Sequence, residues 1–313
     1  SVRRRAQNGL VPGRFVGGWL GAHRSGRRCR GLVGLRPVRA AVTPMAGGVL
    51  DGQVALITGA ARGQGRSHAL ALAALGAHIV ACDVPGPMHS VGYPLATAED
   101  LDATARLVAG TGRECLAVAT DVRDPLAVDR AVSRAVERFG RLDIAIANAG
   151  IVSTGPLVDV SDLAWQELLA TNLSGVFHTL RAVVPPMQSR RHGRIVVTAS
   201  MGGRMGIKGQ SAYNATKFGV IGLAKSLALE VAGDGITVNV VCPSTVLTPM
   251  VQPDPAVPLP DEVVQRLQRP NPIPRPWLQP EDVTKAVVYL VTDPGVISGS
   301  VLEVGLGASA RLP

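Results

Sequence analysis

The chain is poor in aromatic residues, which make up 3% of its 313 residues. It also contains no uninterrupted apolar run of about 18 or more residues, so the sequence predicts no transmembrane helix. Its apolar fraction of 46% is supplied mainly by alanine, valine and leucine. Small and branched side chains of this kind suit the buried strands of a parallel sheet that is covered by helices.

Cysteine is also scarce, and the four cysteines show no metal-binding pattern. None stands at C-x-x-C spacing or near a histidine in a metal-ligand pattern, so we predict no metal site. Cys82 and Cys242 lie in apolar runs, where a small buried thiol is expected. We therefore expect a reducing compartment and a cytoplasmic location.

The first 48 residues contain ten arginines but no aspartate, glutamate or lysine. Subtracting these ten charges from the net charge of +9 leaves −1 for the remainder of the chain. The basic character therefore belongs to this segment alone. Base-stacking aromatics and a nucleic-acid-binding module are both missing, and we predict neither a nucleic-acid nor a membrane partner.

Residues 1–48 are rich in glycine, arginine and proline and have no regular period. The apolar stretch Val11–Ala22 is interrupted by proline, glycine and arginine, which disfavours a signal peptide. A transit peptide fits the lack of acids better, although serine is scarce. We interpret this extension as disordered, or as sequence upstream of a true start at Met45, and assign the folded domain to residues 49–313.

From Gln53 onward, strand-like and helix-like segments alternate. This alternation predicts a single α/β domain of the Rossmann type, a doubly wound parallel sheet with right-handed crossovers and flanking helices. The predicted strands are Gln53–Thr58, His78–Cys82, Glu114–Ala119, Leu142–Ala147, Arg194–Ala199, Ile236–Val241 and Val301–Val304, and the predicted helices include Gln64–Leu75, Pro125–Phe139, Ala212–Val231 and one that begins at Pro280.

Two longer segments interrupt the alternation. Residues 84–98 form an insertion after the second strand that is longer than a typical βα connection. The proline-rich residues 249–280 are interpreted as a substrate loop or lid. Neither this loop nor residues 201–210 carries a charged cluster, which favours an apolar substrate.

A glycine-rich loop at residues 58–65 follows the first strand and opens the first helix. Its glycines let the backbone approach a pyrophosphate, and the helix N-terminus favours negative charge. Asp83, at the end of the second strand, can accept hydrogen bonds from the adenosine ribose and would repel the 2′-phosphate of NADP. We therefore predict NAD as the cofactor, bound by Gly59, Arg62, Gly63, Gln64, Gly65 and Asp83.

Further cofactor contacts are expected where the third and fourth strands end. Asp121 and Val122 follow the third strand, and Asn148, Ala149 and Gly150 follow the fourth. Open parallel sheets bind ligands at the carboxyl ends of their strands. We predict that both groups border the cofactor.

Tyr213 and Lys217 are four residues apart on a predicted helix, so their side chains share one face. A phenol can take an alcohol proton near neutral pH only if cations stabilise its phenolate, as Lys217 and a positive nicotinamide ring would. Ser200 would hold the substrate oxygen, and Asn172 could hold a water in a proton relay. The four residues predict hydride transfer between an alcohol carbon and NAD, with Tyr213 and Lys217 also contacting the cofactor.

The glycine loop, the Asn148–Gly150 turn and the catalytic set together resemble the short-chain dehydrogenase/reductase family, over about Gly52 to Gly307. The resemblance implies that Pro243, Val246 and Thr248 grip the nicotinamide carboxamide. It also implies a homo-oligomer, with a tetramer as the common form of the family.

A narrower resemblance is to the mycofactocin-dependent, carveol-dehydrogenase-like branch, carried by Gly59–His68, Tyr93–Leu101 and Pro274–Trp277. It implies that the insertion covers NAD and keeps it bound between turnovers, and that mycofactocin, a redox peptide cofactor, reoxidises it. The predicted reaction interconverts a secondary alcohol and a ketone, preferably terpenoid- or steroid-like. One alternative is an ordinary family member with freely exchanging NAD, acting on a steroid, small alcohol or 3-oxoacyl substrate. An inactive Rossmann binding protein is disfavoured by the complete catalytic set.

Overall fold

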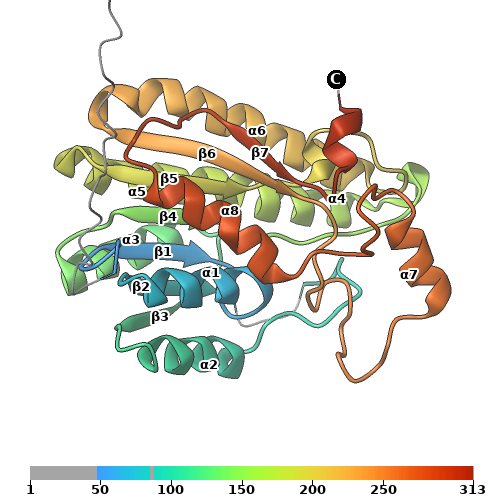
Figure 1. Cartoon of the computed structure of the whole chain (residues 1–313), viewed down its shortest axis with the longest axis horizontal. Helices are drawn as coiled ribbons and strands as arrows, with labels where there is room; N and C mark the ends of the chain where they lie inside the picture. The colour runs from blue at the N-terminus through green and yellow to red at the C-terminus, as the bar shows by residue number, and fades with distance from the viewer. Residues whose placement is uncertain (1–47, 85–87, 313) are drawn as a thin grey trace, which may run out of the picture. The chain divides into compact units, whose positions relative to one another are not determined.

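The computed structural model describes residues 48–84 and 88–312, so the predicted extension lies outside the described residues except for Gly48. Within them, seven strands form one sheet between two layers of helices (Figure 1). Each predicted strand is present, with ends that agree within two residues. The strands are β1 (Val54–Thr58), β2 (His78–Asp83), β3 (Cys115–Ala119), β4 (Ile144–Ala147), β5 (Gly193–Thr198), β6 (Ile236–Pro243) and β7 (Val301–Val304).

The strand order is β3-β2-β1-β4-β5-β6-β7, and every neighbouring pair is parallel. The predicted doubly wound sheet is thus confirmed. The chain moves outward in one direction from β1 and in the opposite direction from β4. The connections after these two central strands therefore diverge, and a cleft forms beyond their carboxyl ends.

Side chains of β1 alternate between two apolar cores. Val54 and Leu56 face the core under α3, α5 and α6, whereas Ala55 and Ile57 face the core under α1, α2 and α8. Because both faces of the sheet are covered, its strands are mostly apolar on both faces. The helices are α1 (Gly63–Ala74), α2 (Ala98–Ala109), α3 (Pro125–Phe139), α4 (Asp162–Leu168), α5 (Gly175–Arg190), α6 (Ser211–Val231), α7 (Asp261–Gln268) and α8 (Pro280–Thr292).

Four of the eight helices, α2, α4, α5 and α7, have no counterpart among the predicted helices, and two of them change how a predicted segment is described. Helix α2 begins directly after Thr97, whose hydroxyl accepts a hydrogen bond from the Asp100 amide in a capping box, so the insertion ends at this cap. The interpretation of residues 249–280 as loop alone is wrong, because α7 lies within them. Two acids in its first turn and half-buried valines on one face favour this helix.

Helices α4 and α5 are joined by a π-helical turn at Leu169–Ser174. In such a turn one extra residue is accommodated in an otherwise continuous helix. In the described part of the chain, no helix combines the length and apolarity that crossing a membrane requires.

Candidate active site

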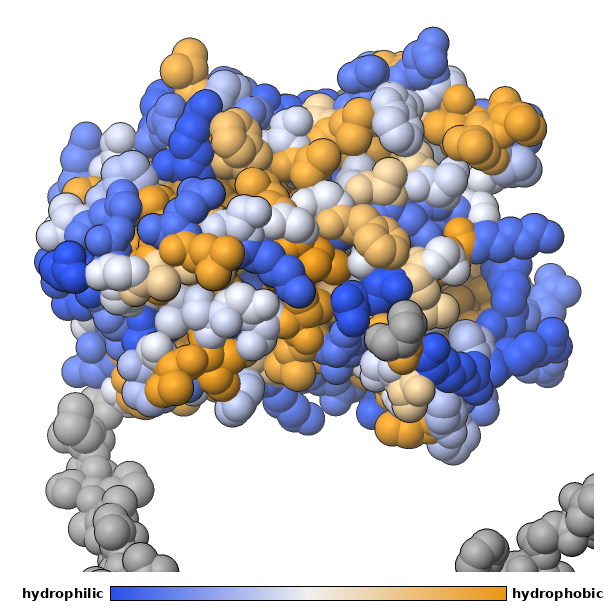
Figure 2. All heavy atoms as spheres, turned by 90° about the horizontal axis from the view of Figure 1, so that it is seen from above, coloured by the Kyte–Doolittle hydropathy of each residue, from blue (hydrophilic) through white to orange (hydrophobic). Residues whose placement is uncertain are grey.

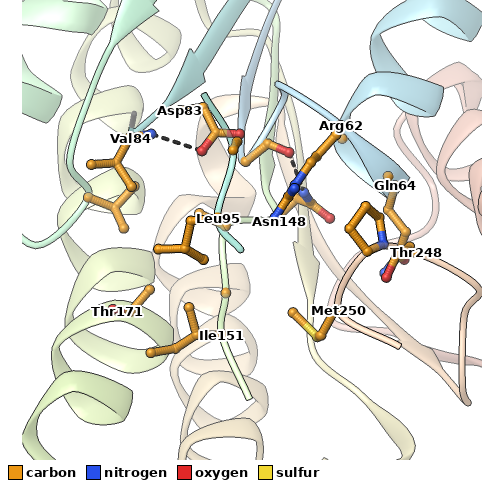
Figure 3. Close-up of a pocket in the computed structure, with 18 of the residues that line it drawn as sticks. Arg62, Gln64, Asp83, Val84, Leu95, Asn148, Ile151, Thr171, Thr248 and Met250 are labelled. Atoms are coloured by element: carbon orange, nitrogen blue, oxygen red, sulfur yellow. Dashed lines mark hydrogen bonds between the residues drawn. The ribbon is translucent and has the colours of Figure 1, made fainter. Parts of the chain in front are cut away.

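A cleft opens where the strand order reverses, and its lining comes mainly from residues that follow β1, β2, β3, β4 and β6 (Figure 3). Most of the predicted cofactor ligands meet there. Those that line the cleft are Gly59, Arg62, Gly63, Gln64, Gly65, Asp83, Asp121, Val122, Asn148, Ala149, Gly150 and Thr248.

The glycine loop leaves no room for side chains at its turns. Gly59 and Gly63 have positive φ angles of 68° and 54°. A Cβ atom on Gly65 would lie 2.0 Å from the carbonyl oxygen of Gly59. The Oε1 atom of Gln64, a cleft residue, is buried without a hydrogen-bond partner among the described residues. The close backbone and the unpaired polar atom fit a bound dinucleotide, which Gly59, Gly63 and Gly65 would hold at its pyrophosphate.

Asp83 is fixed by the backbone around it. Its Oδ2 atom accepts a hydrogen bond from the Ala61 amide at 2.8 Å. Its Oδ1 atom accepts one from the Val84 amide at 2.8 Å, which is drawn in Figure 3. Burial raises the pKa of this carboxyl, while the two amides and the guanidinium of Arg62 oppose the rise. A carboxylate held here suits the ribose hydroxyls of NAD and repels a 2′-phosphate.

The loops after β1 and β4 are tied together at the floor of the cleft. The Thr58 hydroxyl accepts hydrogen bonds from the amides of Asn148 at 3.0 Å and Ala149 at 3.1 Å. In return, the Asn148 side-chain amide donates to the Thr58 carbonyl oxygen at 3.0 Å. The Asn148–Gly150 turn therefore has a structural role as well as a place in the cleft.

Tyr213 and Lys217 lie on successive turns of α6, as predicted, with Lys217 Nζ 5.6 Å from the centre of the Tyr213 ring. Lys217 is buried and donates a hydrogen bond to the Thr198 carbonyl oxygen at 2.9 Å, at the end of β5. Burial lowers the pKa of Lys217 to about 8. The ammonium is thus held next to the phenol by the last residue of a strand.

Ser200 completes this group. Its hydroxyl accepts a hydrogen bond from the Gly202 amide at 3.0 Å. Burial raises the pKa of Tyr213, and the nearby Ser200 hydroxyl opposes the rise. Ionisation of this phenol therefore depends on nearby positive charge.

Asn172 lies in the π-helical turn and is fully buried. Its Oδ1 atom accepts a hydrogen bond from the Ile151 amide at 2.8 Å, and its Nδ2 atom donates to the Ile151 carbonyl oxygen at 2.8 Å. A Cβ atom on Gly150 would lie 3.3 Å from Asn172 Oδ1 and 3.5 Å from Lys217 Nζ. The side chain thus fixes the backbone beside Lys217, and its relay water stays a prediction.

Four of the predicted cofactor ligands are not among the lining residues: Tyr213 and Lys217, described above, and Pro243 and Val246. Pro243 ends β6 inside the sheet, and Val246 is buried and pairs with Leu278. Neither is among the lining residues, although Thr248, from the same segment, is. The cleft is also lined by residues that were not among the predicted ligands, and the position of the insertion next to Asp83 was the signal for five of them. These residues are Val84, Met88, Tyr93, Leu95 and Ala96 from the insertion, and Thr120, Ile151, Thr171, Pro249 and Met250.

The fold and this site define an oxidoreductase of the dinucleotide-binding class, and comparison with known proteins gives its family. The model of the short chain dehydrogenase family matches residues 53–257. The (-)-trans-carveol dehydrogenase of Rhodococcus erythropolis is 42% identical over 274 residues, which cover 84% of this chain and 99% of the relative. The chain therefore belongs to the short chain dehydrogenase family.

Solved structures agree with this assignment. The carveol dehydrogenase from Mycobacterium avium in complex with NAD is 41% identical, with a TM-score of 0.81, and the match covers 84% of this chain and all (100%) of that one. Levodione reductase is 33% identical with a TM-score of 0.75 over 84% of this chain and 99% of its own. The predicted family, the enzyme class and the choice of NAD are confirmed.

Proposed function

We propose that the protein interconverts an apolar secondary alcohol and a ketone, using NAD that stays bound between turnovers and is reoxidised by mycofactocin. The proposal depends on residues 88–96 of the insertion, which we call the strap, because part of this segment lines the cofactor cleft. Met88, Tyr93, Leu95 and Ala96 of the strap line the cofactor cleft. A dinucleotide in this cleft would lie against the strap, which would slow its departure.

The C-terminal end of the strap is hydrogen-bonded to residues on both sides of the cleft. The Tyr93 phenol oxygen accepts a hydrogen bond from the Val152 amide at 3.0 Å, just beyond the Asn148–Gly150 turn. On the other side, the Arg62 guanidinium of the glycine loop donates to the Pro94 carbonyl oxygen. These bonds must break before the strap can lift, which supports slow exchange of the cofactor.

In the proposed mechanism, Tyr213 takes the hydroxyl proton of the alcohol and Ser200 holds the oxygen as it becomes a carbonyl. Lys217 stabilises the phenolate by its charge. The cofactor, when bound, supplies a nicotinamide ring that accepts the hydride. Asn172 keeps the backbone beside Lys217 in place through Ile151.

An apolar substrate is supported by the surroundings of the catalytic phenol. Tyr213 packs at the edge of a cluster built on Met88, Ile151, Leu168 and Ala212. None of these side chains can neutralise a charged substrate group. Carveol is a terpenoid alcohol, and the carveol dehydrogenases among the relatives favour this class.

The first test measures cofactor content. The purified full chain is denatured, and the supernatant is assayed for NAD(H). We expect about one NAD(H) per chain, retained through dialysis. Absence of cofactor would contradict retention and favour the ordinary dehydrogenase with exchanging NAD, for which secondary alcohols would be screened with added NAD.

A second test removes the strap. Replacing residues 88–96 by a short glycine-serine linker should raise the NADH dissociation rate at least about tenfold, because the cleft loses one wall. An unchanged rate would show that the strap does not retain the cofactor. Reoxidation is tested by adding mycofactocin to enzyme reduced by the alcohol, where loss of NADH absorbance is expected.

The remaining parts of the proposal concern the state of the protein in the cell. We propose that the protein is a homotetramer. Large apolar side chains that are exposed on two helices support this: Phe177 on α5, and Phe218 and Leu229 on α6. Seen from above, on the side of α6, hydrophobic patches lie between hydrophilic residues (Figure 2). We also keep a cytoplasmic location, supported by free thiols at Cys82, Cys115 and Cys242.

A further inference from the structure

The N-terminal end of the strap is hydrogen-bonded to a carboxylate that is not among the cleft-lining residues. Glu167, in the last turn of α4, is 8% exposed. Its Oε2 atom accepts hydrogen bonds from the Ser90 amide at 2.9 Å and from the Ser90 hydroxyl, and its Oε1 atom accepts one from the His89 amide at 3.3 Å. A buried carboxylate is costly unless such donors satisfy it, so this contact is specific.

Glu167 also stands next to the loop after β3. Asp121, which lines the cleft, accepts three side-chain hydrogen bonds from Arg123, at 2.9 Å, 3.0 Å and 2.7 Å. The pKa of Arg123 is raised by its hydrogen bonds to Asp121, and the charge of Glu167 adds to this rise. The Arg123 guanidinium, paired with Asp121, is therefore also weakly attracted to the Glu167 carboxylate.

The same helix leads directly into the catalytic region. Leu168, next to Glu167, packs in one cluster with Met88 of the strap. In the following π-helical turn, the Thr171 hydroxyl lies 3.9 Å from the Met88 sulfur, and Asn172 follows it. The N-terminal end of the strap therefore packs on the helical segment that contains Asn172.

We propose that Glu167 is a positioning residue that holds the strap closed against α4 and thereby sets the rate at which NAD(H) leaves the cleft. The proposal rests on the proposed function in one respect, that the strap covers the cofactor. It does not require the cofactor to be captive, because a dissociation rate can be compared between variants whether exchange is slow or fast.

The test compares Glu167→Ala, Glu167→Gln and Ser90→Ala with the wild-type chain. Glu137→Gln, an exposed change on α3, is the matched control. Each protein is loaded with NADH, and the loss of NADH fluorescence is followed after mixing with excess NAD. Hydrogen exchange at the His89 and Ser90 amides reports whether the strap is attached.

Glu167→Ala should raise the NADH dissociation rate at least about tenfold, because it removes three hydrogen bonds to a charged acceptor. Glu167→Gln keeps the shape and one acceptor oxygen, and should give a smaller rise, as should Ser90→Ala. In both Glu167 variants, exchange at residues 89 and 90 should speed up in parallel. The Glu137→Gln control should match the wild type in both measurements.

Two outcomes would overturn the proposal. Unchanged exchange at residues 89 and 90 in Glu167→Gln would mean that the carboxylate does not hold the strap. Faster exchange with an unchanged NADH dissociation rate would mean that the attached strap does not control release. A wild-type chain that loses NADH quickly would count against a captive cofactor, yet the comparison of variants would still decide the role of Glu167.

Discussion

Acid should destabilise the folded domain through His68, a residue of the cofactor helix α1. The ring is fully buried, with Nδ1 2.8 Å from the Thr284 hydroxyl and Nε2 without a hydrogen-bond partner among the described residues. Protonation would place a charge and an unpaired donor in the core. Burial therefore lowers the pKa of His68 from 6.5 to about 4.

The direction in which pH changes the free energy of unfolding depends on whether the folded or the unfolded chain binds the proton. Between about pH 6.5 and pH 4 the unfolded chain takes up a proton at this histidine and the folded chain does not, so the free energy of unfolding falls as the pH falls. At about 1.4 kcal/mol per pKa unit, His68 should cost about 3 kcal/mol of stability once the pH is below both values. A domain is stable by only about 5–15 kcal/mol, so the loss is measurable.

Urea unfolding of the wild type and of His68→Asn at about pH 7 and about pH 4.5 tests this. The asparagine amide can still bond to Thr284 but does not titrate. The wild type should lose about 2 kcal/mol more than the variant between the two pH values, at equal cofactor content and protein concentration. His89→Asn, at an exposed ring, should behave as the wild type. Equal losses in the wild type and His68→Asn would refute the reasoning.

Three further predictions concern the site. Tyr213→Phe should lower kcat at least about a thousandfold, because it removes the proton acceptor, while NADH binding by fluorescence titration stays within about twofold; turnover near wild type would refute the assigned base. Asp83→Ser should shift the ratio of kcat/KM values toward NADP at least about tenfold, since the carboxylate is gone and Arg62 remains; an unchanged ratio would contradict its role. Gly65→Ala should lower the free energy of unfolding by more than about 2 kcal/mol, because its methyl would lie 2.0 Å from a backbone carbonyl oxygen, whereas Gly222→Ala on α6, with open space, should not.

The parts of the fold and site that sequence predicted are those encoded over short distances. Strands buried on both faces are continuous apolar runs, as at Val54–Thr58. The glycine loop and the Tyr213–Lys217 spacing lie within one turn or one helix. The sheet then brings these local patterns together, because parallel strands place their carboxyl ends on one edge.

The strap could not be predicted in the same way. Its anchor pairs are far apart in the chain, as with Ser90 and Glu167, which are separated by 77 residues. No local pattern marks such a pair before the fold is known. Helix α7 could not be predicted from the sequence for a different reason. The prolines on both sides of it indicate a loop.

The π-helical turn at Leu169–Ser174 also constrains how this family member can change by insertion and deletion. Removing one residue would restore a regular α-helix, which local backbone energetics would favour. Every residue on one side of the turn would then rotate by about 100° relative to the other side. Glu167 lies in α4 just before this turn, and Asn172 lies within it. A helix shortened by one residue would still form, but Glu167 would no longer face the strap while Asn172 faces the catalytic centre. The length of the chain at this point therefore matters for the alignment of the site rather than for formation of the helix.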